Sequence, residues 1–100
     1  MSNPTKQEKE YWDRIASLGC ICCRIDGRFN PLVSIHHIEG RTKKGCHRKV
    51  LALCAGHHQD GTGNDRTMIA VHPWKARFED RYGTQEQLME MTNHLLGEDK

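Results

Sequence analysis

Two short pairs of potential metal ligands constrain this chain more than any other feature of its sequence. Cys20 and Cys23 form a C-x-x-C pair, and Cys54 and His57 form a C-x-x-H pair further along the chain. A two-residue spacer allows both side chains of a pair to turn towards one ion, and sulfur and nitrogen ligands at about 2.0–2.3 Å are typical of tetrahedral zinc. We therefore predict that these four residues hold one structural zinc ion.

The size and composition of the chain favour such a site. Only 36% of its 100 residues are hydrophobic and 6% are aromatic, and small domains with so thin a core usually need disulfides or a structural metal. The five cysteines are an odd number, which argues against a complete set of disulfides, so Cys22 and Cys46 are expected to be free thiols. We predict a single domain over residues 1–100, with its core over about 20–90 and an N-terminal helix within 1–19.

Local patterns in the first half of the chain predict a helix followed by a β-hairpin. Residues 4–18 are expected to be helical, because Thr5 and Glu8 can form a capping box and Gly19 can end the helix. Residues 33–38 and 48–53 contain β-branched and aliphatic side chains typical of strands, and we expect them to pair with each other.

The second half of the chain is expected to be mostly helical. A short helix is expected near Cys54, before the turn-forming residues 60–65, and residues 68–72 are expected to be extended. Pro73 is expected to open a helix that runs to Tyr82 and ends at Gly83. A second capping box then starts the last helix, whose apolar side chains we expect in the core; these residues are Thr84 with Gln87, and Leu88, Met91 and Leu95. The fold class predicted from these patterns is α+β.

Positive charge is concentrated between residues 41 and 49, although the formal net charge of the chain is only +2. The cations of this segment are Arg41, Lys43, Lys44, Arg48 and Lys49, with no acidic residue among them. A patch of this kind suits a phosphate backbone, the alternative being a solvated basic loop.

The sequence contains no apolar run of membrane-spanning length, and its first ten residues show no signal-peptide pattern. We therefore expect a cytoplasmic protein in a reducing compartment, where thiols stay available for zinc.

Histidines cluster at two places that flank the predicted hairpin. His36 and His37 end the first strand, and His58 directly follows the second ligand pair. Neighbouring strand residues point to opposite faces and a strand end can re-aim them, so that one histidine can bind metal while the other faces a substrate. We expect His36, His37 and His58 to come together around one cation.

These motifs and their order resemble the HNH nucleases that carry a zinc staple and share the ββα-metal fold. More closely, the segments CICCRIDG, SIHHIEGRTKKGCHRKVLALCAGHH and AVHPWKARFEDRYGTQEQL resemble the phage recombination-enhancement nuclease (Ref) family, over about residues 20–90. The resemblance implies a small zinc-stapled ββα-metal domain with flanking helices. It also implies a phage or prophage endonuclease that hydrolyses phosphodiester bonds of DNA, acts with a RecA filament and works in a bacterial host cell.

The resemblance further implies a role for each histidine. His36 and His58 would bind a catalytic divalent ion, such as Mg²⁺, Mn²⁺ or Zn²⁺, and His37 would be the general base. His72 would either complete the shell of that ion or be structural. His47 lies in the region that the middle asparagine of HNH proteins usually occupies, and it would orient His37 or contact phosphate.

Two other classes of protein also fit parts of the sequence. If the chain is a non-catalytic zinc module that binds DNA or RNA, the ligand pairs and the basic segment are explained, but His36, His37 and His58 have no assigned role. A zinc domain that binds another protein is the third interpretation. A plasmid-nicking assay with a His37→Ala control separates the first interpretation from the other two.

Overall fold

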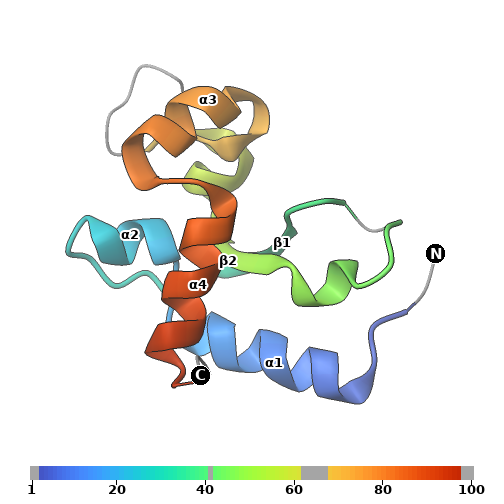
Figure 1. Cartoon of the computed structure of the whole chain (residues 1–100). Helices are drawn as coiled ribbons and strands as arrows, with labels where there is room; N and C mark the ends of the chain where they lie inside the picture. The colour runs from blue at the N-terminus through green and yellow to red at the C-terminus, as the bar shows by residue number, and fades with distance from the viewer. Residues whose placement is uncertain (1–2, 41, 62–67, 98–100) are drawn as a thin grey trace.

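Two antiparallel strands surrounded by helices make up the fold, which confirms the predicted α+β class (Figure 1). The computed structural model describes residues 3–40, 42–61 and 68–97. Its elements, in chain order, are α1 (Lys6–Ser17), α2 (Ile21–Ile25), β1 (Val33–His37), the 3₁₀ turn η1 (Cys46–Arg48), β2 (Val50–Cys54), the π-helical turn η2 (Gly56–Asp60), α3 (Val71–Tyr82) and α4 (Gln85–Leu95).

The hairpin divides the interior into two apolar clusters, because alternate residues of a strand point to opposite faces. On one face, Leu51 and Leu53 of β2 pack in a cluster with Phe78 of α3 and Leu88 of α4. On the other face, Val50 and Ala52 form a second cluster with Ile15 of α1. Figure 1 shows the hairpin between α1 at one end of the molecule and α3 at the other, with α4 crossing the hairpin.

The register of the hairpin separates the two adjacent histidines of β1. His36 is paired with Leu51 and His37 with Val50. Because Leu51 and Val50 belong to different clusters, His36 points to the side of α3 and α4, whereas His37 points to the side of α1.

Both predicted capping boxes are present. The Thr5 side chain accepts a hydrogen bond from the Glu8 N–H and the Glu8 side chain accepts one from the Thr5 N–H, while Thr84 and Gln87 do the same at the start of α4. Each pair satisfies two N–H groups that a helix start leaves without an intrahelical partner. The starts of α1 and α4 are therefore fixed by residues within one turn of each helix.

Three details of the predicted elements are wrong. The second strand begins at Val50 rather than at residue 48, because residues 46–48 form the 3₁₀ turn η1. Residues 71 and 72 belong to α3, although His72 itself has extended backbone angles. Met91 and Leu95 are 40% and 41% exposed rather than core residues, because the buried line of α4 consists of Gln85, Leu88 and Thr92.

Within the described residues, no helix is both long and apolar enough to cross a membrane. The predicted loop over residues 60–65 lies largely outside the described residues.

Candidate metal centres and active site

Cys20, Cys23, Cys54 and His57 converge in the interior, as their spacing predicted, and all four are buried. The two sulfur atoms of Cys23 and Cys54 are 3.8 Å apart. The Nδ1 atom of His57 lies 3.2, 3.4 and 3.6 Å from the sulfurs of Cys54, Cys20 and Cys23. In a zinc tetrahedron with bonds of about 2.0–2.3 Å, ligand atoms are about 3.4–3.8 Å apart. The four side chains therefore fit a structural zinc ion.

Local structure places the two halves of this cluster. Cys20 is the N-cap of α2 and its sulfur accepts a hydrogen bond from the N–H of Cys23, which holds the first pair together. Cys54 ends β2, and η2 turns His57 back towards it. A Cβ atom added at Gly56 would lie 2.1 Å from the sulfur of Met68, so a larger residue in this turn would require the Met68 side chain to move.

The remaining cysteines lie outside this group, and none of the five forms a disulfide. Cys22 and Cys46 are fully buried. A hydrogen bond from the Cys22 thiol, together with one from His57, lowers the pKa of Cys20, whereas burial raises the pKa of Cys22. Cys20 is thus the preferred thiolate, and Cys22 remains a neutral thiol beside it.

A series of hydrogen bonds holds the imidazole of His57 at its Nε2 atom, whereas its Nδ1 atom faces the sulfurs. Its Nε2 atom lies 2.9 Å from the hydroxyl of Tyr82 in α3, and that hydroxyl donates to Asp26 at 3.0 Å. Arg81 in turn donates to the other Asp26 oxygen at 2.7 Å. Burial raises the pKa of Tyr82, so its hydroxyl keeps its proton. The arrangement orients His57 so that Nδ1 faces the three sulfurs.

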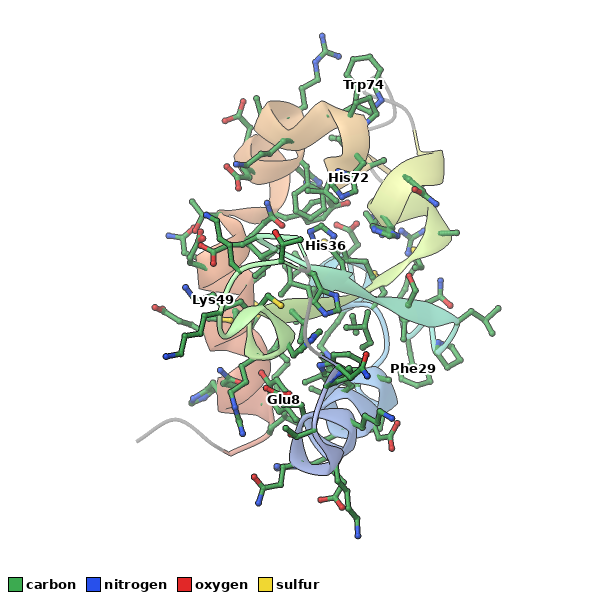
Figure 2. The ribbon with its side chains drawn as sticks, turned by 90° about the vertical axis from the view of Figure 1, so that its right-hand side faces the viewer. Glu8, Phe29, His36, Lys49, His72 and Trp74 are labelled. Atoms are coloured by element: carbon green, nitrogen blue, oxygen red, sulfur yellow. The ribbon has the colours of Figure 1, made fainter. Side chains whose placement is uncertain are left out.

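A second group consists of His36, His58 and His72, whose ligand nitrogens all lie within 4.8 Å of one another. They come from the end of β1, from η2 and from the start of α3, and their ring centroids are 5.0–5.4 Å apart. Figure 2 shows His36 and His72 next to each other between the hairpin and α3. His36 is buried, His58 half-buried and His72 exposed, so the group opens to solvent on one side.

The protonation of His36 suits a ligand role. Burial lowers its pKa to about 4, and repulsion from His58, His72 and His37 acts in the same direction. His36 is therefore a neutral imidazole at neutral pH, with one nitrogen available to a cation. Its Nε2 atom lies 2.7 Å from Oε1 of Gln85, which is 5% exposed. No local sequence signal pointed to Gln85.

His37 is not part of this group, contrary to the expected convergence of His36, His37 and His58. Its ring lies on the other face of the hairpin, where Nε2 is 3.0 Å from Nδ1 of His47. Trp12 packs edge-on against both imidazoles and donates a hydrogen bond from Nε1 to the His47 carbonyl at 2.7 Å. The two histidines are 8% and 4% exposed. Strand alternation, together with η1, explains the pairing of His37 with His47 rather than with His58.

Among the residues predicted to contact nucleic acid, Lys43, Lys44, Arg48 and Lys49 are exposed on the surface. Lys49 forms an ion pair with Glu39 at 3.4 Å, and Arg48 lies 3.9 Å from Glu8. Such exposed pairs contribute little stability and can yield to a phosphate. Arg41 lies outside the described residues.

Residues 4–97 match the family model described as "Recombination enhancement, RecA-dependent nuclease". The chain belongs to this family. The match confirms the family resemblance predicted from the motifs, and it covers both ligand pairs and all the histidines discussed above. As a member of the recombination-enhancement family, the chain is one of a group of nucleases whose action depends on RecA.

Proposed function

We propose that this member of the recombination-enhancement family is a metal-dependent DNA endonuclease of the HNH (ββα-metal) type. The observation that carries the proposal is the group of His36, His58 and His72, whose ligand nitrogens lie within 4.8 Å of one another and which is exposed at His72. Nitrogen ligands of this kind suit Zn²⁺ or another transition ion, and a set of three leaves positions for water and phosphate. A divalent ion bound there supplies Lewis acidity at the phosphoryl and leaving oxygens.

His37 is the general base in this proposal, and His47 is the residue that orients it. His37 Nε2 lies 3.0 Å from His47 Nδ1. In the tautomer in which His37 Nε2 donates this hydrogen bond, His37 Nδ1 is able to accept a proton from the attacking water. Trp12 anchors His47 through its backbone carbonyl, so the pair is held by helix α1 rather than by a loop. A neutral imidazole suits the base role because its unprotonated nitrogen can take up a proton.

The surface near the three-histidine group suits a nucleic acid. Trp74 follows His72 in α3, is 40% exposed, and carries the guanidinium of Arg77 5.8 Å from its ring centroid. In Figure 2, His72 lies between His36 and the outward-pointing Trp74. An exposed aromatic ring with a neighbouring cation suits base stacking and phosphate contact. We assign Lys43 and Lys44 to contacts with the phosphate backbone, which position DNA without reading its sequence.

The substrate that follows from the family is DNA held by a RecA filament. The test is a nicking assay on a displacement loop formed by RecA, and on the same duplex without RecA, with Mg²⁺, Mn²⁺ or Zn²⁺ supplied in turn. We expect cleavage of the RecA-held DNA by the unmodified chain and none by His58→Ala. His94→Ala, which changes an exposed histidine of α4, is the matched control and should cleave normally.

Two results would contradict the proposal. One is cleavage by His58→Ala at the rate of the unmodified chain, because the reaction would then not use this metal group. The other is DNA binding without cleavage under every metal condition, which is the behaviour of a non-catalytic zinc module.

A further inference from the structure

Gln85 makes a contact that neither the nuclease chemistry nor the zinc cluster requires. It is the first residue of α4, it is 5% exposed, and its Oε1 atom lies 2.7 Å from Nε2 of His36, which is itself 3% exposed. A separation of 2.7 Å is that of a hydrogen bond. The carbonyl oxygen of a glutamine side chain is only an acceptor, so the proton must be on the histidine nitrogen.

We propose that Gln85 is a positioning residue that fixes the tautomer of His36. Gln85 accepts a hydrogen bond from the Nε2–H of His36, so the proton of the neutral imidazole stays on Nε2. Nδ1 then has a free lone pair and is the atom that binds a cation. The inference rests on the proposed function only in that the group of His36, His58 and His72 binds a divalent ion. Metal-bound histidines usually donate their other N–H to an acceptor that orients the ring.

The turn between α3 and α4 holds Gln85 in place. Gly83 has a φ angle of +100°, which L residues rarely adopt, and the side chain of Thr84, the N-cap of α4, accepts a hydrogen bond from the backbone N–H of Gln87. These features fix the chain immediately before Gln85. The same turn begins at Tyr82, whose hydroxyl supports His57 of the zinc cluster. One four-residue segment, 82–85, therefore contacts an imidazole of each candidate metal group.

A purely structural role for Gln85 makes a different prediction. If Gln85 only filled space at the start of α4, an apolar residue of similar length would preserve the metal group. If it orients His36, the apolar residue frees the ring to exchange its proton between Nδ1 and Nε2, and the metal affinity of the group falls.

The test uses the zinc-loaded chain and three variants. Gln85→Leu removes the acceptor, Gln85→Glu keeps an acceptor in its place, and Gln87→Leu is the matched control. Gln87 is a glutamine of the same helical turn whose Oε1 accepts a hydrogen bond from the N–H of Thr84. Gln87→Leu removes this bond but keeps the one from the backbone N–H of residue 87 to the Thr84 side chain, which holds the start of α4. The tautomer of His36 is measured from its side-chain ¹⁵N shifts. The affinity of the three-histidine group is measured by Co²⁺ titration. Absorption spectra distinguish Co²⁺ bound to the histidines from Co²⁺ bound to the cysteine sulfurs.

We expect the Nε2–H tautomer of His36 in the unmodified chain, in Gln85→Glu and in Gln87→Leu. Gln85→Leu should show a mixture of tautomers and a loss of Co²⁺ affinity of about tenfold or more. Equal Co²⁺ affinity in Gln85→Leu and the unmodified chain would overturn the inference, as would an unchanged tautomer or an equal loss in Gln87→Leu. If the unmodified chain bound no Co²⁺ at these histidines, both the inference and the proposed function would fail. That result differs from a failure of the inference alone, in which the unmodified chain binds Co²⁺ and Gln85→Leu binds it equally well.

Discussion

The hydroxyl of Tyr82 lies 2.9 Å from Nε2 of His57, on the opposite side of the imidazole from the three cysteine sulfurs. The phenol is in turn fixed by Asp26, which accepts its proton at 3.0 Å. A candidate zinc ligand is thus oriented by a residue of α3 that is far from either ligand pair in the sequence. We therefore expect α3 to contribute to zinc binding without supplying a ligand to this cluster.

Replacing Tyr82 with phenylalanine should weaken zinc binding by about 10–100-fold, because His57 loses the partner that fixes its ring. The measurement is competition for zinc with a chromogenic chelator. Tyr11→Phe is the matched control, since the Tyr11 hydroxyl donates to Asn93 and does not touch the cluster. Equal zinc affinity in the two variants would show that the contact between Tyr82 and His57 has no role in binding.

Substitutions at two neighbouring cysteines distinguish a role in zinc binding from a role in core packing. Cys23→Ala should leave the domain unfolded at room temperature, because structural zinc contributes about 10 kcal/mol or more, comparable to the whole stability of a small domain. Cys22→Ala removes an equally buried sulfur that is not in the cluster, and it should remain folded with one zinc per chain. Circular dichroism and metal analysis of both variants provide the measurement. A folded Cys23→Ala chain with full zinc content would exclude Cys23 as a ligand.

Gly83 should be intolerant of a side chain. Its φ of +100° lies outside the usual range of L residues, and a Cβ atom there would meet Oε1 of Gln87 at 2.8 Å. Gly83→Ala should destabilise the domain by about 1–3 kcal/mol in urea unfolding. Gly97→Ala is the control, because Gly97 also has a positive φ but nothing within 4 Å of an added Cβ. Gly97→Ala should lower the free energy of unfolding by less than Gly83→Ala does. An equal loss of stability in both variants would mean that the Gln87 contact is unimportant.

What the sequence predicted well was governed by short-range rules. The two capping boxes, Thr5 with Glu8 and Thr84 with Gln87, follow from residues three positions apart. The zinc cluster follows from two-residue spacings within each pair.

What the sequence did not predict depends on contacts between distant elements. Gln85 meets His36 only because α4 packs across the hairpin, and no local pattern encodes that contact. The separation of His37 from His36 follows from strand alternation, but the identity of its partner, His47, depends on the turn η1. Met91 and Leu95 are apolar, yet the direction in which α4 docks leaves them at the edge of the buried face.

The exposed lysines of the basic segment should contribute to DNA affinity through charge alone. Each phosphate contact adds about 0.9 to the slope of log affinity against log salt concentration. The double variant Lys43→Ala, Lys44→Ala should therefore bind more weakly and show a slope smaller by about two. Lys6→Ala, Lys9→Ala removes the same charge from exposed positions of α1 and is the control. The same slope in both double variants would place the DNA elsewhere.

The most direct test of the central claim is single-turnover cleavage of RecA-held DNA by His37→Ala, with zinc content and Co²⁺ binding measured on the same sample. Loss of a general base is expected to slow cleavage by about 10²–10⁴-fold. Because His37 lies apart from both metal groups, zinc and Co²⁺ binding should be unchanged. Cleavage at the rate of the unmodified chain would contradict the account, since the reaction would then proceed without the base that it assigns.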